Sequence, residues 1–120
     1  MRVDIQQPEL FTAYFSNEID CQIDYLISGI STDSRDVKEG DLFLGIKGEH
    51  FDGSNFVNQA IADGAVCSLA ESGAKSDNVF IVDNVIFRCE DLKNNEIKCV
   101  IENIKEKKNK KNNFKVLMTN

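Results

Sequence analysis

The order of apolar and polar residues along the chain predicts helices that alternate with short strands. Apolar residues recur at helical spacing over residues 8–16, and Pro8 suits the first turn of a helix. A second helix is predicted over residues 54–63, where Ser54 can cap the N-terminus and Gly64 follows the last turn. Apolar residues at helical spacing also predict a helix over residues 89–108.

Short apolar runs between turn-forming residues predict the strands. These runs cover residues 25–30, 42–46, 65–70, 79–82 and 114–118. Helices that alternate with short buried strands are typical of layered α/β folds. The pattern therefore predicts an α/β fold, a small three-layer domain in which short buried strands form a mixed sheet with helices packed on it.

Length and charge narrow the class of protein. The 120 residues predict one domain, and the net charge of −6 argues against a protein that binds nucleic acid by bulk charge. The charge divides into about −11 over residues 1–104 and about +5 over residues 105–120, where Lys and Asn dominate. No apolar run approaches the ~18 residues of a membrane span, and the N-terminus lacks the apolar core of a signal peptide. We expect a cytoplasmic protein that contacts no membrane.

Cysteine and histidine give little support for a metal or catalytic site. The four cysteines form no CxxC pair, and Cys67 lies in an apolar stretch, which predicts reduced, structural thiols. His50 is the only histidine, and no nucleophile elbow of the GxSxG type accompanies it. The sequence predicts neither a metal site nor a catalytic residue.

Residues 29–70 contain two polar loops on either side of one buried strand. The first loop offers the side chains of Thr32 and Ser34 for hydrogen bonds, and in the second Phe51 lies between Gly48 and Gly53. Ligand sites of open α/β sheets form where such loops meet beyond the strand ends. The combination fits a nucleotide or another planar polar ligand, and it fits an ordinary pair of connections equally well.

The same region resembles the N-terminal domain of the Mur ligases, of the MurE and MurF type. The shared pattern is carried by Asp33-Ser34-Arg35, Val37, Gly40-Asp41-Leu42-Phe43, Lys47-Gly48, Asp52-Gly53, Phe56-Val57, Ala60 and Gly64-Ala65. The match covers about a third of the chain. Gly45 departs from the family, which has a side chain there, and we expect it to weaken the strand.

The resemblance implies that this domain holds the UDP end of a UDP-N-acetylmuramoyl peptide. It implies that Ser34 contacts the uracil and ribose, with Thr32 beside it, and that Glu49, His50 and Phe51 line the uridine pocket. A second group of motif residues is expected to have structural roles, through ion pairs or loop-closing hydrogen bonds. This group is Asp33, Arg35 and Asp41.

These ligases form an amide bond by phosphorylating a carboxylate with ATP, which requires a Gly-rich phosphate loop and Mg²⁺. No such loop occurs in this chain, so the chain itself should bind neither ATP nor Mg²⁺ and should be inactive alone. The resemblance implies a binding domain over residues 1–104, a linker over 105–113, and the start of an ATP-binding domain over 114–120. ATP-binding and C-terminal domains would follow.

The Lys-Gly-Glu-x-Phe-Asp-Gly pattern at residues 47–53 resembles the MurF type more closely, and the MurF type adds D-alanyl-D-alanine to the tripeptide. The MurE type, which adds the third peptide residue, is the alternative. Two other classes stay open. One is a stand-alone module that binds a nucleotide sugar without catalysis, and the other is an interaction domain with an acidic body and a basic tail.

Overall fold

The computed structural model describes residues 1–73, 75–91, 96–105 and 110–119. Within them the helices are α1 (Pro8–Glu18), a 3₁₀ turn η1 (Gly53–Phe56) and α2 (Val57–Ala62). The strands are β1 (Arg2–Ile5), β2 (Gly29–Ser31), β3 (Asp41–Gly45), β4 (Cys67–Ala70), β5 (Val79–Ile81), β6 (Asn84–Asp91), β7 (Glu96–Lys105) and β8 (Lys110–Thr119).

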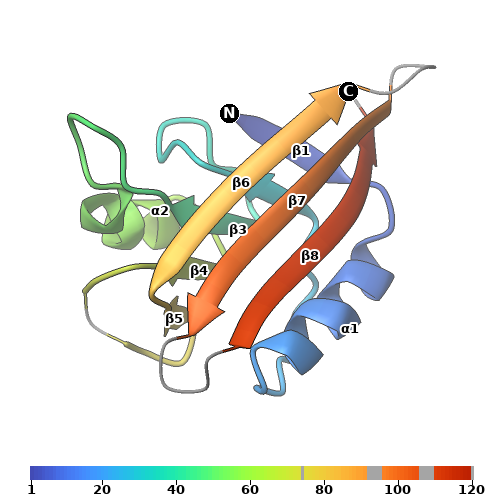
Figure 1. Cartoon of the computed structure of the whole chain (residues 1–120), viewed down its shortest axis with the longest axis horizontal. Coiled ribbons are helices and arrows are strands. Elements are labelled where there is room, and N and C mark those ends of the chain that lie inside the picture. Colours follow the sequence, from blue (N-terminus) through green and yellow to red (C-terminus); the bar gives the residue numbers. More distant parts are fainter. Residues whose placement is uncertain (74, 92–95, 106–109, 120) are drawn as a thin grey trace.

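All of these strands join one mixed sheet, in the order β5-β4-β3-β2-β1-β8-β7-β6. The strands β2 to β5 run parallel, and β1 pairs antiparallel with both β2 and β8. The strands β6, β7 and β8 pair antiparallel and pass in front of β3 and β4 in Figure 1. The predicted α/β fold with a mixed sheet is confirmed.

Alternation along the parallel strands separates two hydrophobic cores, because successive strand residues point to opposite faces. On β3, Leu42 and Leu44 belong to a core that also holds Phe15 of α1 and Ile101 of β7. Phe43, between them, belongs to a second core with residues of α2 and β5. Helix α2 therefore covers one face of the parallel strands, while α1 and the β6–β8 segment cover the other (Figure 1).

The predicted helix over residues 89–108 is wrong. The described part of this range lies in β6 and β7, while residues 92–95 and 106–108 lie outside the described residues. The apolar positions fit a helical period, but Ile97, Cys99 and Ile101 also alternate at the strand period. Val85 and Ile101 are buried in the core with Leu42, so covering that face of the parallel strands decides between the two patterns.

The N-terminal strands also differ from the prediction. The sequence analysis missed β1, although Val3 and Ile5 alternate with polar residues and both are buried. The second strand is Gly29–Ser31, shorter than the predicted 25–30. Two residues before Gly29, the Ile27 N–H leaves the sheet pattern and donates to the Thr12 hydroxyl of α1 at 2.9 Å.

The start of the second helix is built differently from the prediction. Asp52, and not Ser54, provides the N-cap, since its carboxylate accepts the Ser54 N–H at 2.9 Å. The Ser54 hydroxyl instead accepts the N–H groups of Glu71 and Ser72, at 3.2 and 3.3 Å. Ser54 thus ties this turn to the segment after β4.

The predicted last strand is present and longer than expected. Residues 110–119 form β8, which pairs with β1 and β7. Of the predicted linker, residue 105 ends β7, residues 110–113 begin β8, and 106–109 lie outside the described residues. The boundaries of a linker and of a following domain stay predictions.

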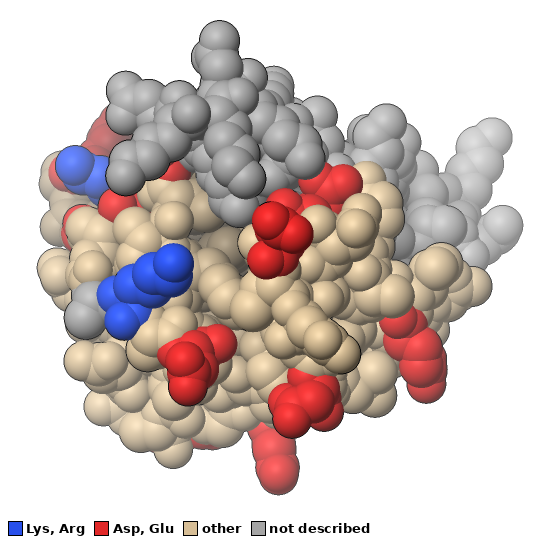
Figure 2. All heavy atoms as spheres, turned by 90° about the horizontal axis from the view of Figure 1, so that it is seen from below, with Lys and Arg blue, Asp and Glu red and all other residues tan. Residues whose placement is uncertain are grey.

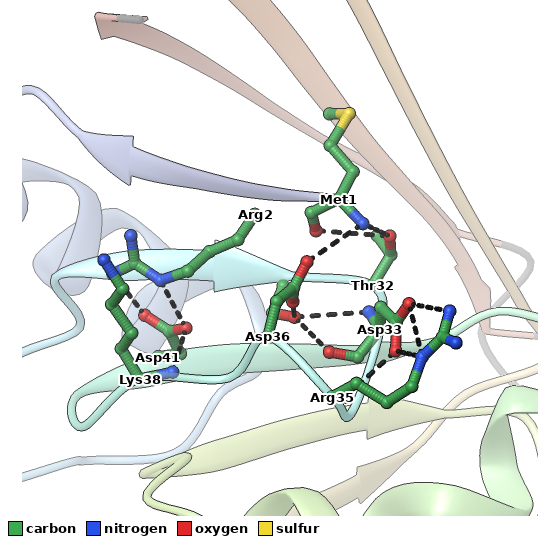
Figure 3. A network of polar contacts seen from close by, with 9 residues as sticks. Met1, Arg2, Thr32, Asp33, Arg35, Asp36, Lys38 and Asp41 are labelled. Atoms are coloured by element: carbon green, nitrogen blue, oxygen red, sulfur yellow. Dashed lines mark hydrogen bonds and ion pairs between the residues drawn. The ribbon is translucent and has the colours of Figure 1, made fainter.

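A buried ion pair joins β1 to β3 across β2. The Asp41 carboxylate is fully buried and accepts hydrogen bonds from Arg2 Nε at 2.8 Å and Arg2 Nη2 at 2.9 Å. It also accepts the Lys38 N–H at 2.9 Å (Figure 3). Gly29 of β2 lies beneath the pair, and a Cβ there would collide with Asp41 Oδ1 and with Arg2 Nη2. The absence of a side chain at Gly29 on β2 therefore leaves room for the ion pair between β1 and β3.

Asp41→Asn should lower the free energy of unfolding by about 3 kcal/mol, because it leaves the partly buried Arg2 guanidinium without its main counter-charge. Asp4→Asn is the matched control, since Asp4 pairs with the same arginine at 2.7 Å but is 71% exposed. We expect the control to cost less than about 1 kcal/mol. Urea denaturation measures both variants, and equal losses would contradict the structural weight given to the buried pair.

Candidate functional site

The loop after β2 is a tight polar turn that carries four of the motif residues. The Asp33 carbonyl accepts the Asp36 N–H at 3.1 Å, which closes a β-turn with Ser34 and Arg35 at its centre. Thr32 is anchored to the start of β1, because its N–H donates to the Met1 carbonyl at 2.9 Å. The loop is thereby held against β1 with the Ser34 side chain half-buried at its surface.

The loop after β3 folds back on itself through backbone hydrogen bonds. The Gly48 N–H donates to the Phe51 carbonyl at 2.8 Å, and the Gly53 N–H donates to the Ile46 carbonyl at 2.9 Å. Gly53 packs directly on the chain, because a Cβ there would lie 2.6 Å from backbone atoms of Ile46. Gly45, expected to weaken the strand, faces the backbone of Gly53 and Ser54, where a Cβ would lie 3.2–3.3 Å away.

This fold of the second loop places Phe51 beside Phe56 of η1. The two rings meet edge to face, with centroids 6.3 Å apart and an interplanar angle of 71°. Phe51 is 59% exposed and Phe56 is 43% exposed. The two adjacent exposed rings form a small apolar surface on this side of the second loop.

The two loops enclose a cavity of about 500 Å³ beyond the ends of β2 and β3. One wall is polar and the other is aromatic. The lining residues are Met1, Thr32, Asp33, Ser34, Arg35, Phe43, Phe51, Gly53 and Phe56. The structure therefore brings the predicted contacts Thr32, Ser34 and Phe51 to one cavity.

Two of the predicted contacts lie elsewhere. His50 is exposed and does not line this cavity. Glu49 is exposed and borders a separate, more open hollow of about 590 Å³ with Lys47, Glu71 and Asn84. Both follow Gly48 at the tip of the second loop, and only Phe51 turns back toward the first loop. Their contact with a ligand stays a prediction.

Asp33 and Arg35 pair with each other across Ser34. The Asp33 carboxylate accepts Arg35 Nη2 at 2.7 Å, Arg35 Nε at 3.0 Å and the Arg35 backbone N–H at 2.9 Å (Figure 3). These bonds from Arg35 hold the pKa of the Asp33 carboxyl well below its ordinary value. The same pairing raises the pKa of Arg35. The Asp33–Arg35 contact closes the loop locally, whereas the Asp41–Arg2 pair joins two strands.

The Ser34 hydroxyl has no hydrogen-bond partner among the described residues, although its neighbours in the loop are bonded. Ser34 is half-buried and lines the cavity, and a serine hydroxyl can donate one hydrogen bond and accept two. It is therefore available to a polar ligand group. The facing aromatic wall offers Phe51 for contact with a flat ring.

Sequence reasoning missed several lining residues. Phe56 falls within the predicted second helix but belongs to the 3₁₀ turn η1, where it is 43% exposed and lines the cavity. Phe43 lines the cavity from β3, opposite in face to Leu42 and Leu44. Phe56 is one of the motif residues shared with the Mur ligases, and that membership was the sequence signal that could have pointed to it. Nothing in the sequence indicated that Met1 would reach the same place.

The cysteines that the structure describes have structural surroundings. Cys67 is fully buried and unpaired, and burial raises the pKa of its thiol to about 12. Cys21 is unpaired and partly buried. The prediction of a reduced core thiol is thus confirmed for Cys67, while the side chains of Cys89 and Cys99 lie outside what the structure describes.

Among the residues that Figure 2 colours, charge is spread over the face and not gathered in one patch. Asp and Glu side chains are spread over it, with fewer Lys and Arg among them. Across residues 1–73, 75–91, 96–105 and 110–119, no three His, Cys, Asp or Glu side chains gather as a metal-binding group. In the same part of the chain, no helix is both long and apolar enough to span a membrane.

Comparison with known proteins identifies the class to which this fold and cavity belong. The family model described as "Mur ligase family, catalytic domain" matches residues 26–116, about three quarters of the chain. The matched range includes both loops and the strands between them. The chain belongs to the Mur ligase family.

Particular relatives are ligases of two kinds. The chain is 56% identical over 52 residues to the UDP-N-acetylmuramoyl-L-alanyl-D-glutamate--2,6-diaminopimelate ligase of Syntrophomonas wolfei, covering 43% of this chain and 11% of that ligase. It is 44% identical over 48 residues to the UDP-N-acetylmuramoyl-tripeptide--D-alanyl-D-alanine ligase of a Synechocystis strain, covering 40% and 11%. The chain spans about an eighth of the length of the curated relatives that it matches.

A solved structure supports the same fold. The crystal structure of MurF from Acinetobacter baumannii aligns with 68% of this chain and 19% of its own, at 28% identity and a TM-score of 0.50. The small α/β domain with its mixed sheet and two helices is therefore the N-terminal domain type of the Mur ligases.

The Asp33–Arg35 contact predicts a pH-dependent signal. Since the folded pKa of Asp33 lies below its unfolded value near ~3.9, its contribution to stability is present above that pH and is lost as the pH falls through the folded pKa. Arg35→Gln should raise the pKa of Asp33 toward the ordinary value. Carboxyl carbon chemical shifts followed by NMR measure both proteins, and an unchanged titration in the variant would contradict the pairing.

Proposed function

We propose that this chain binds the uridine diphosphate end of a UDP-N-acetylmuramoyl peptide, as the N-terminal domain of an ATP-dependent, amide-forming ligase of peptidoglycan precursor synthesis. The single observation that carries the proposal is the cavity between the two loops, with Ser34 on one wall and Phe51 on the other. Membership in the Mur ligase family supports this choice of ligand over other planar polar molecules.

The chemistry of the cavity fits the uridine part of such a ligand. A volume of about 500 Å³ lies within the range of small-molecule sites. The exposed face of Phe51 can stack on a pyrimidine ring, a contact available to any base. Ser34 and Thr32 can hydrogen-bond the polar edges of the uracil or the ribose. The rest of the ligand would extend outward from the open side of the cavity.

The residues of this chain do not fit ATP and Mg²⁺. The sequence has no Gly-rich loop ending in Gly-Lys-Thr or Gly-Lys-Ser, and the one arginine that lines the cavity is already paired with Asp33. We therefore derive no phosphoryl-transfer step from these residues. In the proposal, ATP, Mg²⁺ and catalysis belong to ATP-binding and C-terminal domains that follow in a longer ligase.

The finer assignment lies between two ligases. The expected MurF type, which adds D-alanyl-D-alanine, is supported by the Synechocystis relative and by the Acinetobacter structure. The MurE type is supported by the higher identity to the Syntrophomonas diaminopimelate ligase. We place the MurE type first on that identity, with MurF as the alternative. Assays of a longer ligase with each acceptor would distinguish the two.

Ser34→Ala should weaken the binding of UDP by about 1 kcal/mol, because one neutral hydrogen bond is lost while the fold is kept. Isothermal titration calorimetry measures the affinity. Ser72→Ala is the control, since Ser72 is exposed and does not line the cavity. Equal affinities for the Ser34 variant and the unaltered protein would show that Ser34 does not contact the nucleotide.

Phe51→Ala should weaken the same binding by about 1–3 kcal/mol through the loss of base stacking. Leu10→Ala is the matched control, because Leu10 is 66% exposed on α1 and does not line the cavity. Absence of UDP binding in the unaltered protein, together with stable self-association in sedimentation experiments, would favour an interaction domain instead.

A further inference from the structure

Two hydrogen bonds close the turn around Ser34, one to a side chain and one within the backbone. The Asp33 carboxylate accepts the Arg35 N–H at 2.9 Å, which is the side-chain-to-backbone bond of an Asx-turn. The Asp33 carbonyl accepts the Asp36 N–H at 3.1 Å, which closes the β-turn over the same residues. Ser34 is the residue enclosed by both hydrogen-bonded rings.

Ser31 anchors the same turn from below. Its side chain is fully buried, and its Oγ accepts the Asp33 N–H at 3.2 Å. The Ser31 Oγ also lies within hydrogen-bonding distance of the Asp33 carbonyl, at 2.8 Å, and of the Asp36 carboxylate. The peptide groups on both sides of Asp33 are thus tied to the end of β2.

The ion pair and the backbone bond of Asp33 contribute differently. The Arg35 side chain is 86% exposed, and an exposed ion pair contributes little because water and salt screen it. The bond to the Arg35 N–H acts on the backbone of the turn itself. An asparagine at position 33 could keep this bond through its side-chain oxygen, while an alanine could not.

We propose that Asp33 is a positioning residue, whose side-chain oxygen holds the Ser34 hydroxyl toward the cavity by accepting the Arg35 N–H. The identity of the ligand rests on the proposed function, but the positioning of Ser34 is a property of the free protein. Asp33 therefore contributes to nucleotide binding through Ser34 rather than through its charge.

A double-mutant cycle with UDP tests this coupling. Ser34→Ala should weaken binding about fivefold, which corresponds to one neutral hydrogen bond. Asp33→Ala should cause a loss of similar size, and the double variant should bind no more weakly than Ser34→Ala alone. Asp33→Asn, which can keep the bond to the Arg35 N–H, should restore binding to within about twofold.

A measurement without ligand separates this inference from the proposed function. Amide hydrogen exchange by NMR should show faster exchange of the Arg35 N–H in Asp33→Ala and nearly unchanged exchange in Asp33→Asn. The inference would be overturned if the loss of affinity in the double variant equalled the product of the two single losses. It would also be overturned if Asp33→Asn lost as much affinity as Asp33→Ala. Unchanged Arg35 exchange in Asp33→Ala would also overturn it. Failure of the unaltered protein to bind UDP would overturn the proposed function. The exchange of the Arg35 N–H would then be the remaining test of whether the Asp33 side chain holds the turn.

Discussion

The buried pair between Arg2 and Asp41 is the interaction on which the arrangement of the site depends. It joins β1 to β3 over the bare position of Gly29, and it also holds the loop before β3 through the Lys38 N–H. A carboxylate without solvent contact is stable only when its hydrogen bonds are satisfied, so this register of three strands is strongly preferred. The loops that follow β2 and β3 therefore leave the sheet side by side.

The two loops reach a defined shape by different means. The first uses side chains, with Ser31 and Asp33 bonded to the backbone of the turn. The second uses its own backbone and the close packing of Gly53 against Ile46. The result is a polar wall that carries a free hydroxyl and an aromatic wall that carries exposed rings. In the proposed function, the flat base of a nucleoside would lie against the aromatic wall and its polar edges would face the polar wall.

The local patterns of the sequence predicted much of the fold, and the contacts between distant residues explain what they missed. Helix α1 follows from helical periodicity, the parallel strands follow from short apolar runs, and the motif residues lie in and around both loops. Residues 89–108 were misassigned because their apolar positions fit two periods, and only packing against Leu42 selects the strand. The partner of Asp41 lies 39 residues away in a strand that was not predicted. Glu49, His50 and Phe51 were expected together from the resemblance to the Mur ligases, and the structure brings only Phe51 of the three to the cavity.

An NMR titration of the labelled chain with UDP, and separately with UDP-N-acetylmuramoyl-tripeptide, tests the central claim most directly. The account predicts that both ligands shift the amide signals of residues 32–35 and 51–53, which border the cavity. Additional shifts with the tripeptide alone would show that the domain also contacts the peptide. Shifts confined to other surfaces, such as the hollow lined by Gln22, Tyr25 and Asn78, would contradict the assignment of the site.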